Sequence, residues 1–208
     1  MRLRRARLLR KKSRSCCTAK CELFDDQRII LIQITTTIVL FSFIHDHHRS
    51  PSIKKLDPAA LGKLQACEHL SLSTNAIDKL DSFGQMPKLR ILSMGRNNIK
   101  KFAKLEDVAG TLEEVWMSYN SLKSLDDIGP LDNLEVLYVG NNLIEDFGEL
   151  DKLAHLPKLR DVLLLGNPMY DQFEEENEQR VEVLKHLPNL AKIDGKMVTP
   201  AEREAAKA

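Results

Sequence analysis

The chain has 208 residues, a formal net charge of +1 and only 5% aromatic residues. This length suits one domain and an extension at roughly 100–200 residues per domain, and scarce aromatics favour thin aliphatic layers over one large core. The charge is uneven, because residues 1–50 carry 11 Lys and Arg against 4 Asp and Glu. The remaining 158 residues carry 20 against 26. An acidic main body argues against nucleic-acid binding.

Residues 1–50 begin with a strongly basic stretch, Met1–Arg14, and contain a β-branched apolar run, Ile29–Ile44. This run of 16 residues is shorter than the roughly 20 that cross a bilayer as a helix. Histidines and an aspartate follow it, where a secretory signal has small residues. A membrane segment is therefore disfavoured. We predict an atypical extension, and the alternatives are a disordered or mis-called segment, a targeting or anchoring segment, and another role.

The four cysteines do not form a disulfide framework. Cys16, Cys17 and Cys21 crowd near the N-terminus, and Cys67 stands alone. With the histidines of the segment 45–48 the first three could be imagined as a zinc site, but the spacing matches no usual zinc motif. No metal or cofactor is expected.

One pattern, L-x-x-L-x-L-x-x-N-x-[IL]-x-x-[LF], recurs five times from Cys67 onward, and a truncated sixth copy begins at Leu190 and Ile193. Successive copies start 22, 23, 22 and 25 residues apart, which is typical of leucine-rich repeats. We therefore predict an α/β leucine-rich-repeat solenoid over residues 51–208. A parallel sheet would line its concave face, and short helical turns its convex face.

The alternating leucines of each copy predict a short strand with one buried face. The asparagine that follows can accept and donate hydrogen bonds to backbone groups where the chain turns away. We predict that these asparagines form a ladder through the solenoid. The ladder residues are Asn75, Asn97, Asn120, Asn142 and Asn167.

The end of the solenoid needs a cap that covers the apolar layer of its last repeat. From about residue 171 the sequence predicts an acidic helix, roughly Asp171 to His186, whose buried side chains would be Phe173, Val181, Leu184 and Leu187. The run Thr199–Glu202 is typical of a capping box with proline at the first helical position. A short final helix should begin there.

The residues between the buried leucines point onto the concave face. They change from small and polar in the first copies to aromatic and aliphatic in the later ones. Exposed apolar patches commonly mark binding surfaces, and Trp and Tyr are favoured anchors in them. We predict a protein-binding patch there, and the alternative is that the acidic helix folds over it. The patch residues are Trp116, Val136, Tyr138, Leu163 and Leu165.

Motifs for catalysis are missing from the sequence: it has no glycine-rich phosphate loop, no G-x-S-x-G and no histidine pair at metal-ligand spacing. We expect a binding protein and no enzyme.

Three runs resemble more than the general repeat: residues 67–75, 89–100 and 111–120 are similar to the leucine-rich-repeat light chains of axonemal outer-arm dynein. The likeness extends from about Ile53 to Gly195. It implies a non-catalytic subunit in the cytoplasm and cytoskeleton of motile cilia or flagella. Such a subunit binds the dynein heavy chain at its motor region and tunes motility.

The same resemblance implies that the patch around Trp116 faces the partner, and that the C-terminal helix containing Arg203 contacts the motor or tubulin in microtubules. Residues 1–50 depart from the family, which opens with a soluble helical segment. The alternatives are an intracellular repeat adaptor of the phosphatase-regulator or spliceosomal type, and a membrane-anchored receptor.

Overall fold

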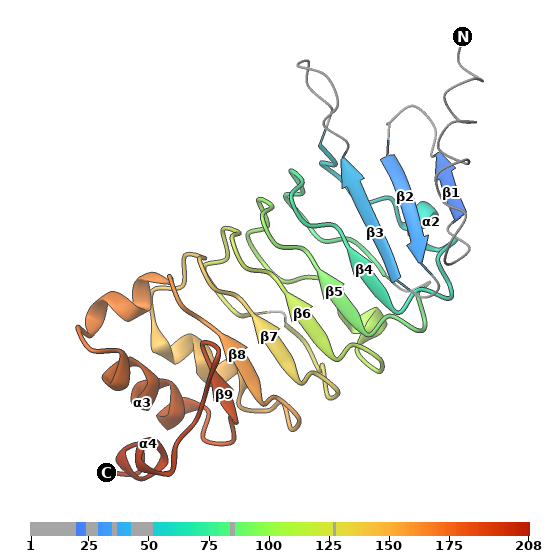
Figure 1. Ribbon diagram of the computed structural model, residues 1–208. Coiled ribbons are helices and arrows are strands. Elements are labelled where there is room, and N and C mark those ends of the chain that lie inside the picture. The colour runs from blue at the N-terminus through green and yellow to red at the C-terminus, as the bar shows by residue number, and fades with distance from the viewer. Residues whose placement is uncertain (1–19, 24–28, 35–36, 43–51, 84–85, 127) are drawn as a thin grey trace, which may run out of the picture.

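The computed structural model describes residues 20–23, 29–34, 37–42, 52–83, 86–126 and 128–208, with side chains described from residue 52 onward. Its strands form one ten-stranded sheet in chain order (Figure 1). The strands are β1 (Lys20–Leu23), β2 (Ile29–Ile34), β3 (Thr37–Ser42), β4 (His69–Ser71), β5 (Ile91–Ser93), β6 (Glu114–Trp116), β7 (Val136–Tyr138), β8 (Asp161–Leu163), β9 (Lys192–Ile193) and β10 (Lys196–Met197). Strands β3 to β9 are parallel, and the pairs at the two ends of the sheet are antiparallel.

Each turn of the solenoid contributes one three-residue strand whose central side chain enters the core. Parallel pairing is in register, so that these central side chains stack on one another along the molecule. They are fully buried, at 0% exposure: Leu70, Leu92, Val115, Leu137 and Val162. The predicted leucine-rich-repeat solenoid is confirmed.

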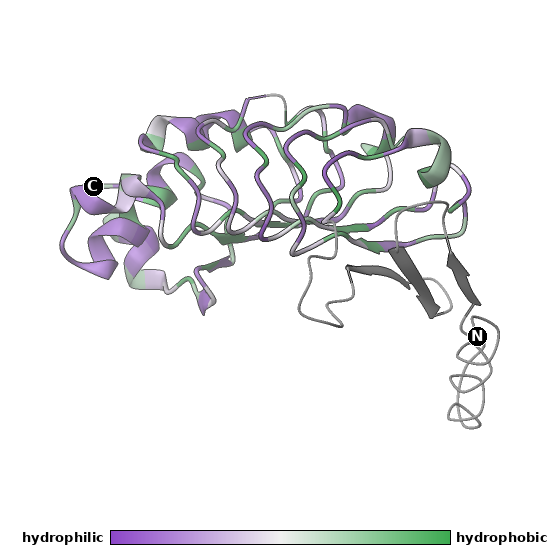
Figure 2. Ribbon diagram, turned by 90° about the horizontal axis from the view of Figure 1, so that it is seen from above, coloured by the Kyte–Doolittle hydropathy of each residue, from purple (hydrophilic) through white to green (hydrophobic). Residues whose placement is uncertain are grey.

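The convex side is only partly helical, and Figure 2 shows it opposite the sheet. It carries α2 (Pro58–Leu61) and the 3-10 helices η1 (Glu106–Val108) and η2 (Phe147–Leu153). Asp57 caps α2 and Asp146 caps η2, each by accepting a hydrogen bond from the N–H two residues later. The other described turns on this side, before the cap, contain no regular helix.

The five ladder asparagines connect neighbouring turns through their side chains. Each Oδ1 accepts a hydrogen bond of 3.0 to 3.2 Å from a backbone N–H of the preceding turn. Each Nδ2 donates to a carbonyl of its own turn at 2.6 to 2.9 Å. Asn97, Asn120, Asn142 and Asn167 also donate to a carbonyl of the preceding turn, at 3.0 or 3.1 Å. The ladder thus satisfies backbone groups that the turn would leave buried and unpaired.

The C-terminal cap consists of η3 (Pro168–Gln172), α3 (Glu176–His186) and α4 (Pro200–Ala205). The acidic helix starts later than the predicted Asp171, because Phe173 adopts an extended backbone and packs its ring edge-on against Phe147. Its inward face also differs from the prediction: Val183 is buried, whereas Val181 is half-buried. The predicted capping box at Thr199 and Glu202 is confirmed.

The apolar run Ile29–Ile44 contains β2, β3 and four residues outside the described part of the chain, 35–36 and 43–44. Strand β3 pairs with β4, so this segment continues the sheet beyond the first repeat. No helix in the described residues is long and apolar enough to cross a membrane. The basic stretch 1–14 and the residues Cys16, Cys17 and 45–48 of the zinc alternative lie outside the described residues.

Candidate functional site

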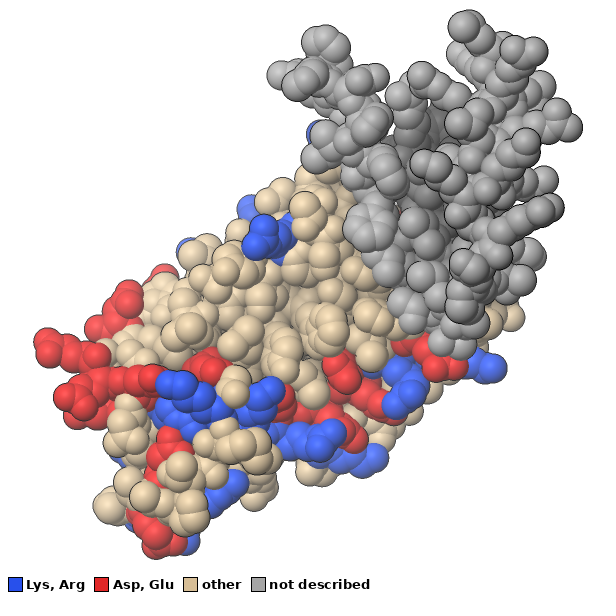
Figure 3. Space-filling model, in the orientation of Figure 1, with Lys and Arg blue, Asp and Glu red and all other residues tan. Residues whose placement is uncertain are grey.

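The five predicted patch residues come together on the concave face, and we call them the concave patch. Strand register places Trp116 beside Tyr138, and Tyr138 beside Leu163. The rings of Trp116 and Tyr138 stack with centroids 6.2 Å apart and planes inclined by 19°. Val136 is half-buried, and Leu165 is 55% exposed. Figure 3 views this face, on which uncharged residues form a broad central area between charged edges.

Small residues on the neighbouring strands make room for the large side chains of the patch. Ser93 pairs with Trp116 and is buried, while His69 on the next strand meets the tryptophan edge-on at 5.7 Å between centroids. At Gly140 a Cβ would approach the Leu163 Cγ to 3.3 Å and the Leu165 carbonyl oxygen to 3.0 Å. Glycine therefore allows the leucines of β8 to close onto β7.

Hydrogen bonds fix both aromatic rings. The Trp116 Nε1–H donates to Glu114 at 3.1 Å. The Tyr138 hydroxyl donates to Asp161 at 3.1 Å, and Lys192 donates to the same carboxylate oxygen at 2.9 Å. Because both rings are already held, a contact through them would cost little side-chain entropy.

These contacts also change the acidity of the polar groups around the patch. Burial, followed by the charge of Asp161, raises the pKa of Tyr138, so the phenol stays protonated. The hydrogen bond to Asp161 raises the pKa of Lys192, which stays charged. Burial lowers the pKa of His69, and the opposing effect of Glu114 is smaller. His69 is therefore a neutral neighbour of Trp116 at pH 7.

The cap leaves the concave patch open. Helix α3 packs against η2 and α4 at the end of the solenoid, and Figure 1 shows it beyond β8 and β9. The alternative that the acidic helix folds over the patch is therefore wrong. Its inward face is used to close the last repeat, where Val183 and Leu184 are buried.

Arg203 lies on α4 and is not part of the concave patch. Its guanidinium donates to the carbonyl of Pro188 at 2.7 Å and to that of Leu190 at 2.6 Å. These bonds fasten α4 to the segment that leads into β9. The structure thus gives Arg203 a positioning role inside the cap.

Sequence reasoning missed a buried ion pair in the cap, between Arg180 of α3 and Glu202 of α4. The Arg180 Nε lies 2.5 Å from Glu202 Oε1, and the same guanidinium donates to the carbonyls of Ile193 and Met197. The hydrogen bond from Arg180 is the main cause that lowers the pKa of Glu202 to about 2. No sequence signal pairs two residues 22 positions apart in a non-repeating segment.

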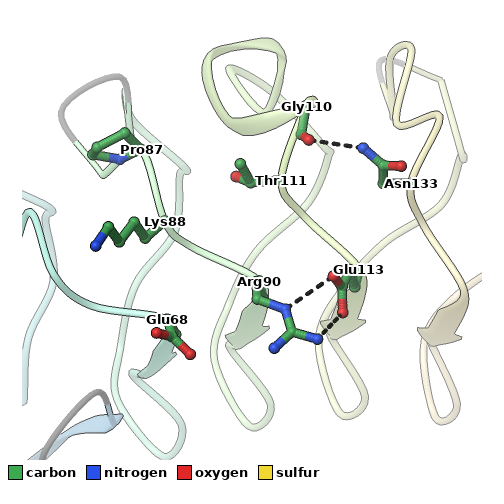
Figure 4. A pocket seen from close by; sticks show the side chains of 8 residues that line it. All are labelled: Glu68, Pro87, Lys88, Arg90, Gly110, Thr111, Glu113 and Asn133. Atoms are coloured by element: carbon green, nitrogen blue, oxygen red, sulfur yellow. Dashed lines mark hydrogen bonds and ion pairs between the residues drawn. The ribbon is translucent and has the colours of Figure 1, made fainter.

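A shallow cleft opens at the edge where the chain enters the strands (Figure 4). Arg90 donates to both carboxylate oxygens of Glu113, at 2.9 and 2.5 Å, and Asn133 donates to the carbonyl of Gly110 at 2.7 Å. Two pairs of polar groups in this cleft thus bind each other. Among the described residues, no three His, Cys, Asp or Glu side chains could hold a metal ion together.

Comparison with known families agrees with the repeat architecture. The family described as "Leucine rich repeat" matches residues 49–99, and "Leucine Rich repeats (2 copies)" matches residues 111–175. Among solved structures, an internalin from Listeria monocytogenes has a TM-score of 0.52 at 23% identity, covering 74% of this chain and 42% of its own. A repeat protein from Leptospira interrogans has a TM-score of 0.52 at 26% identity, covering 68% and 34%. These structures support the fold.

Much closer relatives exist by sequence. Dynein axonemal light chain 1 of Chlamydomonas reinhardtii is 59% identical over 163 residues, which are 77% of this chain and 82% of the relative. The proteins of the same name from Danio rerio and Homo sapiens are 54% and 53% identical over 154 residues, covering 74% of this chain and 80% of each relative. The chain therefore belongs to the axonemal dynein light chain 1 family of leucine-rich-repeat proteins.

Proposed function

We propose that this chain is a non-catalytic subunit of axonemal outer-arm dynein, which binds the motor region of a heavy chain through the concave patch. The observation that carries the proposal is the pre-stacked pair Trp116 and Tyr138 on an open sheet face, in a chain of this family. Buried aromatic anchors supply most of the free energy at protein interfaces. The protein would thus act in the axoneme of cilia or flagella, where it tunes motility.

The direct test is binding of the tagged full-length chain to an outer-arm dynein motor domain. We expect the Trp116→Ala/Tyr138→Ala variant to bind at least about 30-fold more weakly, since each anchor contributes about 1 kcal/mol or more. The matched control is Tyr119→Ala/Leu143→Ala, which removes exposed apolar side chains outside the concave patch. It should bind as wild type does.

Affinity purification from ciliated cells tests the assignment as a whole. An axonemal heavy chain that co-purifies with wild type and is lost with the Trp116→Ala/Tyr138→Ala variant supports both the function and the site. Recovery of a phosphatase or a splicing component in place of dynein would overturn the proposal and leave only the solenoid.

A microtubule contact through the C-terminal helix is a second part of the proposal. Since Arg203 already donates to two carbonyls of its own cap, we expect it to hold α4 in position for that contact. Arg203→Ala should then reduce both co-sedimentation with microtubules and the thermal stability of the cap. Weaker co-sedimentation at unchanged stability would instead mark Arg203 as a direct contact.

A further inference from the structure

A second surface lies along the edge where the asparagine ladder turns the chain away from the sheet. Successive turns are held in register there by backbone hydrogen bonds: the N–H of Asn98 donates to the carbonyl of Ile77, and that of Ser121 to the carbonyl of Ile99, at 2.8 and 2.9 Å. In each turn, two residues follow the buried apolar residue at this edge, such as Ile77 or Ile99. These pairs of residues therefore form two parallel rows along the edge.

These rows are basic along the first four turns. The pairs of residues read Lys-Lys, Asp-Lys, Lys-Lys and Lys-Ser, and every lysine is exposed. We call these lysines the lysine ridge. Its members are Lys54, Lys55, Lys79, Lys100, Lys101 and Lys123.

The next turn reverses the charge, with Glu145 and Asp146 at the same two positions, and the exposed acidic residues 174–176 of the cap follow. In Figure 3, basic side chains stand along the upper edge of the concave face, and acidic ones gather at its C-terminal end. The edge is thus polarised along the molecule.

Within the described part of the chain, the ridge lysines take part in no ion pair. Two other lysines of the solenoid are paired with carboxylates. Lys104 binds Asp81 at 3.0 Å, and Lys152 binds Asp126, the carboxylate near Lys101, at 2.7 Å. Asp78 interrupts the row and Asp126 lies near Lys101, but the six exposed lysines outnumber these carboxylates. The remaining positive charge costs repulsion in the folded protein, and a ligand of opposite charge relieves it.

We propose that the lysine ridge binds a short acidic peptide segment of a partner protein. Neighbouring turns stack roughly 5 Å apart, so four turns span about 15 Å, which about five extended residues cover. The arginine and the aromatic ring beside the ridge, Arg96 and Tyr119, are engaged with each other, with the guanidinium carbon 5.1 Å from the ring centroid. The ridge therefore offers mainly lysines, which favours carboxylates over the phosphates and bases of nucleic acid. A longer polyanion would also meet Glu145 and Asp146. The proposal is independent of the concave patch.

The test measures fluorescence anisotropy of labelled octaglutamate, with octaglutamine as the uncharged probe. We expect Lys100→Glu/Lys123→Glu to weaken binding by about tenfold, because two attractive contacts become repulsive. Lys100→Arg/Lys123→Arg should bind as wild type does, and added salt should weaken binding because the site is exposed. Trp116→Ala/Tyr138→Ala should leave the affinity for octaglutamate unchanged.

The matched control is Lys88→Glu/Lys158→Glu, which makes the same change of charge at two equivalent, exposed positions of the opposite edge. It should retain binding within about twofold of wild type. The proposal is overturned if this control weakens binding as much as the ridge variant, or if a single-stranded oligonucleotide of eight residues binds more tightly. Self-association that requires Lys100 and Lys123 would also overturn it, because the occupant would then be a second copy.

Discussion

At the scale of single residues, the ladder asparagines differ in how much they stabilise the fold. Asn142 is 4% exposed and connects the carbonyls of Met117 and Val139 with the N–H of Leu122. Asn75 is half-buried and makes no bond to a carbonyl of a preceding turn among the described residues. Position in the ladder therefore decides how many buried groups depend on the side chain.

We expect Asn142→Ala to lower the free energy of unfolding by about 2–3 kcal/mol, because several buried backbone groups lose their partner. Asn75→Ala should cost less, roughly 1–2 kcal/mol, because its own side chain is half-buried and water can replace it more easily. Urea unfolding followed by circular dichroism measures both. Equal losses would show that the first and fourth positions of the ladder are equivalent, contrary to the structure.

A second residue-scale prediction concerns the pair Arg180 and Glu202. The carboxylate has a pKa of about 2 in the folded protein, below its ordinary value of 4.5. Its contribution to stability is therefore complete above about pH 4.5 and is lost as the pH falls from there toward 2. Wild type should lose stability faster over this window than Arg180→Leu/Glu202→Leu, which has no such group. Parallel losses in thermal unfolding scans at each pH would contradict the assignment.

At the scale of elements, the packing of β8 against β7 depends on Gly140, which has no side chain. Gly140→Ala should cost about 1–3 kcal/mol and displace the leucines of β8, because the new Cβ meets the backbone of Leu165 at 3.0 Å. Gly110→Ala is the control, since a Cβ there has no neighbour within 4 Å. Binding to the dynein motor domain should fall for the Gly140 variant alone, and an equal fall for both would refute this role.

The elements also show what a sequence can predict. The repeat predicts the strands, the asparagine ladder and the exposure of Trp116 on the concave face. It can do so because each position of the repeat has the same neighbours in every copy. The cap has no such period. The start of its helix depends on Phe173 packing against Phe147, and its core on Arg180 reaching Glu202. Both are contacts between residues far apart in the chain, which local preferences do not reveal.

Asp194 shows the same limit at the last turn. Its side chain accepts hydrogen bonds from the N–H groups of Leu164 and Leu165 and from the hydroxyl of Tyr170. A carboxylate thus closes the edge after Asn167, the last asparagine of the ladder. Burial, followed by the charge of Asp194, raises the pKa of Tyr170, so this hydroxyl remains a donor.

At the scale of the whole molecule, a solenoid transmits stability from each turn to the next, and its ends determine where unfolding begins. The described core is one continuous apolar stack that the cap closes with Val183, Leu184 and Leu187. The ion pair of Arg180 joins both cap helices to the hairpin of β9 and β10. Loss of this ion pair should therefore destabilise the cap and the last turn before the other turns.

We predict that Arg180→Ala raises the hydrogen exchange of β8 and β9 amides far more than that of β5 amides. Breaking a buried ion pair costs about 3–5 kcal/mol of stability. We expect this loss to unfold the terminal turn first. Strand β5 lies three strands away from β8 and should be affected much less. Mass spectrometry of exchanged peptides measures the gradient. A uniform rise of hydrogen exchange in all turns would show that the solenoid opens only as one cooperative unit. The concave patch and the lysine ridge would then depend on the cap as much as β9 does.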